Sequence, residues 1–311
     1  MFLAFAGGVG GAKLAFGLAQ ILTPEDLTIV VNTGDDFDHL GLRICPDLDT
    51  VLYTLGGIAN PETGWGQADE TWNFMKALDR VGGETWFRLG DRDLATHVER
   101  TRRLQGGDSL SAITADFAAK LGICHPIVPA TDNPLPTIVR TTDGDLPFQE
   151  YFVRRQCTPV VTGFEFVDAA QAVPSAAVST AFESDRIEAV IICPSNPYVS
   201  IAPILAVPGI SDFLSHAGVP VIVVSPIVGG QAIKGPAAKM MKELGALPSA
   251  LSIANHYRGL ATAMVIDSAD TGYAAPIESL GMQVLVTDTV MKSAADKARL
   301  AADILAFVRR P

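Results

Sequence analysis

Short runs of apolar residues recur along the chain, and each run ends at glycine, proline or polar residues. Apolar runs without a polar face are typical of strands that are buried on both faces of a parallel sheet. We predict such strands at residues 2–6, 27–31, 189–193, 219–224, 263–266 and 283–286. Helical patterns are expected over residues 12–22, which end at a Thr-Pro pair, and over residues 292–308, whose apolar residues share one face.

The first strand is followed by a glycine-rich loop, a helix and a second strand, all within residues 2–31. Such a unit predicts two parallel strands joined by a right-handed crossover. Later strands repeat the pattern. The sequence therefore predicts a Rossmann-like, doubly wound α/β fold with a mainly parallel sheet, whose ligands bind at the carboxyl ends of the strands.

The middle of the chain has a different pattern. Residues 71–121 are mostly helical, whereas residues 134–166 are β-like and richer in turns, with strand-like stretches at 137–140 and 148–154. No proline-, glycine- or serine-rich linker divides the chain. We therefore expect a single domain, residues 1–311, with a helical and β subdomain inserted at about residues 71–170 and covering one face of the sheet.

The composition and charge of the chain argue against some classes of function. Hydrophobic residues make up 48% and charged residues 18% of the chain, as in globular proteins. The net charge of -11 argues against binding to a nucleic-acid backbone or an anionic membrane, although a local nest of backbone N–H groups still binds phosphate. No signal peptide, no apolar run of ~20 residues and no CxxC pair is visible, so we expect a cytoplasmic protein with free thiols.

Residues 7–13 read Gly-Gly-Val-Gly-Gly-Ala-Lys, directly after the first strand. Glycines there let the backbone approach a ligand, and a helix N-terminus binds anions. The dinucleotide fingerprint fails at Lys13, and the P-loop pattern fails at Ala12 and Leu14. We predict nucleotide phosphate contacts from Gly8, Gly10, Gly11 and Lys13; the alternative is a tight strand-to-helix turn without a ligand.

Polar and acidic residues follow the second strand, where Thr33, Asp35 and Asp36 fall in the expected ligand crevice, and Thr33 is predicted to contact the nucleotide. Asp47 is interpreted as the N-cap of a helix beginning near Leu48, which leaves the carboxylate of Asp49 free. Magnesium binds one or two carboxylates together with substrate phosphates. We therefore predict a magnesium site formed by Asp35, Asp36 and Asp49.

Three further segments carry candidate chemistry. Arg88 follows Trp86 and Phe87 and would stack on a ring or hold a phosphate, the alternative being a solvated helix end with local ion pairs. His97 stands four residues after Asp93, a spacing that predicts a structural contact rather than a catalytic role. Ligand contacts are also expected in two turns at strand ends, from Ser195 and Asn196 and from Gly229, Gly230 and Lys234.

Taken together, six segments resemble the 2-phospho-L-lactate transferase (CofD-like) family, in one order over nearly the whole chain. They are residues 7–13, 32–36, 41–50, 85–93, 194–197 and 225–230. The resemblance implies a magnesium-dependent transferase of coenzyme F-420 biosynthesis. Such enzymes move a phosphorylated three-carbon acid from a guanosine diphosphate conjugate to the hydroxyl of 7,8-didemethyl-8-hydroxy-5-deazariboflavin, and GMP leaves.

The resemblance also implies roles for single residues. Asp49 and Arg88 would contact the deazaflavin acceptor beneath the inserted subdomain, and Asn196, the glycine loop and Gly229-Gly230 would hold the nucleotide. Arg88 departs from a lysine used elsewhere in the family. Asp49 is either a metal ligand or the general base on the acceptor hydroxyl. The family also implies a homodimer.

Two other functions are compatible with parts of this pattern. A sister group with the same glycine-loop fold suggests a non-enzymatic nucleotide-sugar-binding regulator of the gluconeogenesis-factor type, and residues 85–93 favour the transferase over it. A dehydrogenase would need the intact dinucleotide fingerprint. The transferred acid, whether lactate, enolpyruvate or glycerate, depends on small differences in the pocket.

Overall fold

A computed structural model describes residues 1–216 and 218–310 of the chain. Its centre is a seven-stranded sheet in which all neighbouring strands are parallel. In order across the sheet the strands are β14 (Gln283–Thr287), β13 (Ala263–Asp267), β10 (Val221–Val224), β9 (Ala189–Ile192), β1 (Phe2–Ala6), β2 (Leu27–Val31) and β5 (Ile127–Pro129). The six predicted strands are all present. The apolar pattern missed β5 because it is only three residues long and ends in proline.

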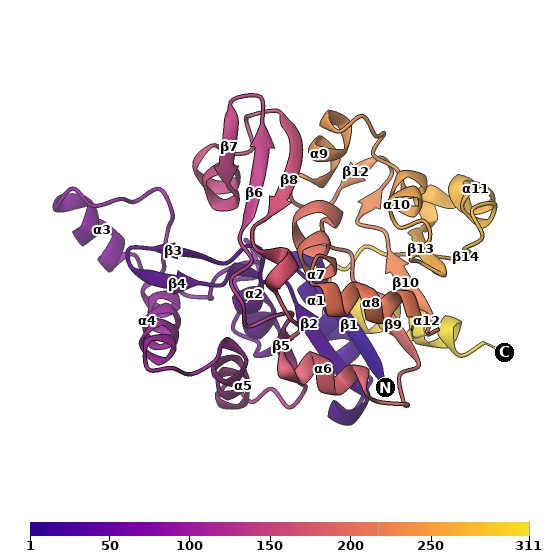
Figure 1. The fold of residues 1–311 in the computed structure, drawn as a ribbon, viewed down its shortest axis with the longest axis horizontal. Coiled ribbons are helices and arrows are strands. Elements are labelled where there is room, and N and C mark those ends of the chain that lie inside the picture. Colours follow the sequence, from indigo (N-terminus) through magenta and orange to yellow (C-terminus); the bar gives the residue numbers. More distant parts are fainter. Residues whose placement is uncertain (217, 311) are drawn as a thin grey trace.

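The order of the strands shows where ligands bind. From β1 the chain builds outward through β2 to β5 at one edge, then returns to β9 beside β1 and builds through β10 and β13 to β14 at the other edge (Figure 1). The direction of winding therefore reverses between β1 and β9. Ligand crevices of open parallel sheets lie at such a switch point, outside the carboxyl ends of the strands.

Helices cover both faces of the sheet, which confirms the predicted doubly wound α/β fold. Alternate residues of β1 enter the two separate apolar clusters, Phe2, Ala4 and Ala6 on one face and Leu3 and Phe5 on the other. The first face is covered by α1 (Gly8–Ala19), α2 (Pro46–Leu55), α5 (Leu110–Lys120) and α12 (Ala294–Val308). The second face is covered by α6 (Ala176–Phe182), α7 (Ala202–Leu205), α8 (Pro208–His216), α10 (Ala250–His256) and α11 (Ala274–Glu278).

The first helix begins earlier than the sequence predicts. The glycine run was expected to be a loop before a helix at residues 12–22, but α1 starts at Gly8 and ends at Ala19. The glycines are needed inside its first turns because the loop after β9 lies against them. A Cβ atom on Gly10 would lie 2.1 Å from the Pro194 carbonyl oxygen, and one on Gly11 would lie 2.6 Å from the Ser195 Oγ.

Part of the segment between β2 and β5 extends away from the sheet, whereas α2 and α5 of the same segment pack against it. We call the extended part the arm; it comprises β3 (Phe37–His39), β4 (Leu42–Ile44), α3 (Asn73–Arg80) and α4 (Asp91–Gln105). Figure 1 shows α3 and the β3–β4 hairpin at the opposite end of the molecule from β13 and β14. The arm has a small apolar cluster of its own, formed by Ile44, Met75 and Leu89.

A three-stranded antiparallel sheet, β7-β6-β8, stands beside the carboxyl ends of the central strands. Its strands are β6 (Thr137–Thr141), β7 (Gly144–Pro147) and β8 (Val161–Phe166), and a hairpin of β11 (Ile227–Val228) and β12 (Gln231–Ala232) leads to α9 (Ala237–Glu243) nearby. The β-like expectation for residues 148–154 was wrong, because residues 150–154 form a π-helical turn. Phe148 and Tyr151 are both buried in one cluster, a spacing that suits a helical turn.

The predicted insertion at about residues 71–170 includes α3, α4 and the small sheet, but also β5, which belongs to the central sheet. Its boundaries stay a prediction. Within residues 1–216 and 218–310, no single helix is both long and apolar enough to cross a membrane; α8 and the helical segment Pro197–Leu205 reach that length and hydropathy only as a pair bent by 85°.

Candidate functional site

A cavity of about 980 Å³ opens at the switch point, a volume at the upper end of the usual range for small-molecule sites. Loops that follow the central strands form one side of it, and α2, α4 and the turn after β7 form the other. Its polar lining includes Gly8, Lys13, Asp35, Asp47, Asp49, Arg88, Asp93, His97, Ser195, Asn196 and Lys234. Segments that the sequence singled out far apart in the chain therefore meet around one cavity.

The loops after β1 and β9 hold each other at the switch point. The Gly7 N–H donates to the Ser195 Oγ over 3.2 Å, and the Gly8 N–H donates to the Asp47 Oδ1 over 2.7 Å. Gly8 has a φ of +63°, a conformation that favours glycine. The start of α1 thus faces the cavity, with its first N–H groups ordered by neighbouring side chains.

The predicted nucleotide-binding residues divide into two groups. The structure places Gly8, Gly10, Lys13, Ser195, Asn196 and Lys234 in the cavity lining. Gly11, Thr33, Gly229 and Gly230 do not line the cavity. Gly11 provides room for Ser195, and the Gly229 N–H donates to Asp270, so these positions shape loops around the cavity; direct contact with a ligand stays a prediction.

Lysines concentrate positive charge beside the glycine loop. The Lys13 Nζ donates to the Met291 carbonyl oxygen over 3.1 Å, and the Lys234 Nζ donates to the Thr63 carbonyl oxygen over 2.7 Å. Burial, together with the charges of Lys234 and Lys297, lowers the pKa of Lys13. A phosphate or diphosphate in the cavity would offset this repulsion, as ammonium groups act as point charges for phosphate.

Two buried carboxylates face the cavity beside the glycine loop. The Asn32 Nδ2 donates to the Asp35 Oδ1 and to the Asp47 Oδ2, both over 2.9 Å, and so ties the two side chains together. Burial and the neighbouring Asp47 raise the pKa of Asp35 well above its usual range, and burial raises that of Asp47 to about 6. The interpretation of Asp47 as a helix cap was wrong: Cys45 is the N-cap, and Asp47 lies within the first turn of α2.

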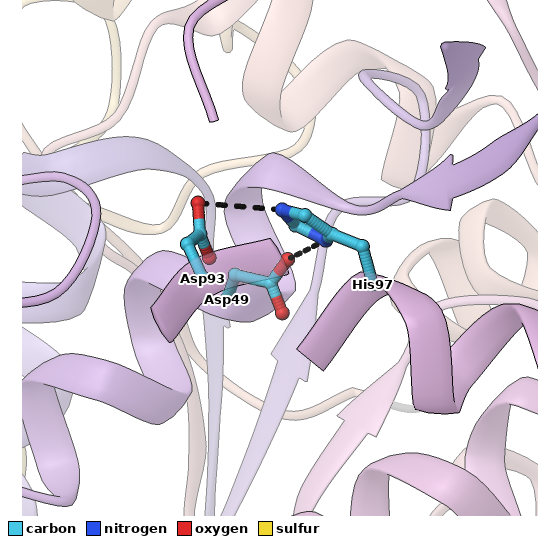
Figure 2. A group of neighbouring side chains, drawn as sticks. All are labelled: Asp49, Asp93 and His97. Atoms are coloured by element: carbon cyan, nitrogen blue, oxygen red, sulfur yellow. Dashed lines mark ion pairs between the residues drawn. The ribbon is translucent and has the colours of Figure 1, made fainter. Parts of the chain in front are cut away.

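The structure does not gather the three carboxylates predicted to hold magnesium. Asp36 is absent from the cavity lining, its Oδ1 is buried without a hydrogen-bond partner, and burial raises its pKa to about 7. Among the residues that the structure describes, the group whose ligand atoms all lie within 4.8 Å of one another is Asp49, Asp93 and His97. Figure 2 shows the His97 ring facing both carboxylates, with one nitrogen toward Asp93 and the other toward Asp49.

The Asp49 carboxylate is not free, contrary to expectation. Arg100 of α4 donates to both of its oxygens, from Nη1 to Oδ2 over 3.1 Å and from Nη2 to Oδ1. Burial alone would lower the pKa of Arg100, but Asp49 keeps it above its usual value. Asp49 and Arg100 are 51 positions apart in the chain, so no local sequence pattern predicts this tertiary contact.

The predicted contact between Asp93 and His97 is confirmed, with the His97 Nε2 lying 3.3 Å from the Asp93 Oδ2. The Tyr53 hydroxyl donates to the Asp93 Oδ1 over 2.6 Å. Tyr53 and Arg100 were not predicted from the sequence. Spacing offered a signal: Asp49 and Tyr53 are four residues apart on α2, as Asp93 and His97 are on α4, so each pair shares one helix face.

Aromatic rings complete the cavity on the side of the arm. Trp86 and Phe87 lie there, and the rings of Phe148 and Phe152, which also line the cavity, stack with centroids 5.4 Å apart. The Arg88 guanidinium lies 4.1 Å from the centre of the Trp72 ring. The arrangement suits a planar, partly apolar ligand.

Comparisons with known proteins show which family and which fold the chain resembles. A family model described as "2-phospho-L-lactate transferase CofD" matches residues 2–302. The chain is 40% identical over 306 residues to the phosphoenolpyruvate transferase of Streptomyces griseus, covering 96% of each chain. It is 37% identical over 296 residues to the 2-phospho-L-lactate transferase of Methanosarcina acetivorans, covering 95% of each. A solved structure from Bacillus halodurans, of the UPF0052 family, shares the fold at 14% identity, with a TM-score of 0.62 over 98% of both chains.

Proposed function

This chain belongs to the 2-phospho-L-lactate transferase CofD family, and from that premise we propose the reaction that it catalyses. It transfers a phosphorylated three-carbon acid from a guanosine diphosphate conjugate to the hydroxyl of 7,8-didemethyl-8-hydroxy-5-deazariboflavin. GMP is released, and the product serves coenzyme F-420 biosynthesis. The observation that carries this proposal is that phosphate-binding and ring-binding features converge on one cavity at the switch point.

We call the two sides of the cavity the donor wall and the acceptor wall. The donor wall is the glycine-rich start of α1 with Lys13, Asp35, Asp47, Ser195, Asn196 and Lys234. It offers a helix N-terminus and two ammonium groups to a diphosphate. Transfer of a phosphate-linked group depends mainly on charge stabilisation and on aligning the two partners, and this wall supplies the first.

The acceptor wall holds Asp49, Arg88, Asp93 and the aromatic rings. A deazaflavin ring fits between the aromatic side chains, and its hydroxyl groups reach the carboxylates. Because Arg100 neutralises Asp49, we assign Asp49 to hydrogen bonding with the acceptor rather than to metal binding. This wall therefore aligns the attacking hydroxyl with the donor.

The chemistry of the donor wall also fits magnesium, although with a different set of carboxylates from the predicted one. Asp35 and Asp47 are buried together beside the glycine loop, and burial raises the pKa of both, so a cation would relieve the cost of ionising them. Magnesium binds one or two carboxylates together with substrate phosphates. We propose that Asp35 and Asp47 hold Mg²⁺, which would neutralise charge on the donor diphosphate.

The test is a reaction with purified protein, Mg²⁺, the deazaflavin and each of three guanosine diphosphate conjugates, carrying lactate, enolpyruvate or glycerate. We expect GMP release and a product whose mass identifies the transferred acid. Omission of Mg²⁺ should abolish turnover. If none of the donors yields GMP, and UDP-sugars but not the deazaflavin raise the melting temperature, the transferase proposal is refuted. The homodimer stays a prediction, which light scattering tests.

A further inference from the structure

Two carboxylates reach the acceptor wall, and they differ in how they are bonded. Asp49 is held by Arg100 through both oxygens, and its side chain is 7% exposed. The Asp93 side chain is 15% exposed and lines the same cavity, and it forms no ion pair with an arginine among the residues that the structure describes. Asp93 is thus the more accessible of the two to a ligand.

Hydrogen bonding fixes the orientation of His97 beside Asp93. The Arg100 Nη1 lies 3.3 Å from the His97 Nδ1. Arginine has no acceptor, so Nδ1 is the accepting nitrogen, and the ring N–H is on Nε2, toward the Asp93 Oδ2. The contact of 3.3 Å lacks hydrogen-bond geometry, and the buried Nε2 has no other partner. His97 therefore limits the movement of the Asp93 carboxylate and leaves its Oδ2 able to accept a hydrogen bond from a ligand.

Tyr53 holds the other oxygen of Asp93 through its hydroxyl, over 2.6 Å. Burial alone would raise the pKa of Asp93, but the neighbouring His97 and the hydrogen bond from the Tyr53 hydroxyl keep it below its usual value. The Asp93 carboxylate is thus ionised near neutral pH. An ionised carboxylate offers about four lone-pair sites, so acceptor capacity remains for a ligand.

We propose that Asp93 binds the hydroxyl-bearing chain of the acceptor, and that Tyr53 and His97 are positioning residues that aim its carboxylate into the cavity. The inference rests on the proposed function, because it assigns a further binding residue to the same reaction. It gives the acceptor wall two adjacent carboxylates, one neutralised by Arg100 and one free to accept, which is the arrangement that neighbouring hydroxyl groups of a polyol require.

The test is a fluorescence titration of the full chain with the deazaflavin. Asp93→Asn keeps the size of the side chain and removes its charge, and it should weaken acceptor binding about 10-fold or more. Tyr53→Phe and His97→Gln leave the carboxylate in place and should weaken binding about 3-fold. GDP affinity should be unchanged in all three variants, and in turnover assays the acceptor KM should rise while the donor KM stays constant.

A deazaflavin that carries a methyl group instead of the hydroxyl-bearing chain distinguishes the loss of this contact from a general structural change in the variant. It should bind wild type and Asp93→Asn equally well. Glu99→Gln is the matched control, because it removes the same charge from an outward-facing site on the same helix, and it should bind the natural acceptor normally.

If Asp93→Asn fails to fold, Tyr53→Phe decides the question. Natural acceptor binding that is equal in wild type and the folded variants overturns this inference alone. Failure of the wild type itself to bind the deazaflavin refutes the proposed function, and the inference with it.

Discussion

The donor wall and the acceptor wall of the cavity are built in different ways. Most donor-wall residues lie in the segments that follow β1, β2 and β9, so the ends of the central strands decide where they lie, whereas Lys234 follows the β11–β12 hairpin. Acceptor-wall residues project from α2, α4, the loop before α4 and the turn at residues 148–156, and they meet only because these elements fold together. A site built on strand ends is visible in the sequence, whereas one built from side-chain networks is not.

The walls also differ in how their charges are compensated. On the donor wall, burial lowers the pKa of Lys13 and raises the pKa values of Asp35 and Asp47, so it disfavours the charged form of all three side chains. A bound anion near the lysine and a bound cation near the carboxylates would stabilise these charged forms. On the acceptor wall, Arg100 already neutralises Asp49. We infer that the donor wall is arranged for charged ligands and the acceptor wall for a neutral one.

The largest effect is expected from a change that removes the ion pair between Asp49 and Arg100 on the acceptor wall. Asp49→Ala leaves the buried Arg100 without its partner and should lower the free energy of unfolding by about 3–5 kcal/mol, besides abolishing turnover. Urea denaturation measures the loss. Glu99→Ala, which breaks an exposed ion pair on the same helix, should leave stability unchanged. A loss below about 1 kcal/mol for Asp49→Ala would show that the pair is not tightly buried.

The next prediction concerns the donor wall. Gly10→Ala places a Cβ atom 2.1 Å from the Pro194 carbonyl oxygen, so the loops after β1 and β9 must separate. We expect a loss of about 1–3 kcal/mol in stability and weaker GDP binding, with deazaflavin binding retained. Denaturation and calorimetric titration measure both. Gly272→Ala, where nothing lies within 4 Å of the added atom, is the control; equal GDP affinities in the two variants would contradict the assignment.

A smaller effect is expected for the cation on the acceptor wall. Arg88→Lys keeps the charge but loses the planar group that lies over Trp72. Cation–π contacts at exposed sites contribute about 0.5–1 kcal/mol, so deazaflavin affinity should fall about 2- to 5-fold, without a change for GDP. Arg92→Lys, an exposed position nearby, should have no effect. A larger loss for GDP than for the deazaflavin would place Arg88 on the donor side.

The smallest effect is expected within the arm, where Asp91 is the first residue of α4. Hydrogen bonds from Thr71, Phe74 and Asn73 lower the pKa of Asp91 to about 2. Because the pKa is depressed in the folded state, the stabilisation is present above the unfolded value near 4 and is lost as the pH falls through about 2. Hydrogen exchange, corrected for intrinsic rates, should show residues 71–80 losing protection in that window. In Asp91→Asn protection should already be low at pH 4; wild-type levels there would contradict the role of Asp91.

Most strands of the central sheet could be predicted from the sequence, for a physical reason. A parallel strand buried on both faces must be apolar throughout, so β1, β2 and β9 stand out as runs. β5 did not, since three residues are too few for a pattern. Residues 148–154 were mistaken for a strand because the packing of Phe148 and Tyr151 decides their helical form.

The doubly wound sheet, the glycine run after the first strand and the family were all readable from the sequence, because they depend on local runs and on motifs in a fixed order. Which carboxylates are free depends instead on how the chain folds. Asp47 meets Asp35 through Asn32, and Asp49 is taken by Arg100 from a helix 51 positions away. The charge that a buried carboxylate offers to a ligand depends on the partners that surround it, and folding brings those partners together from distant parts of the chain.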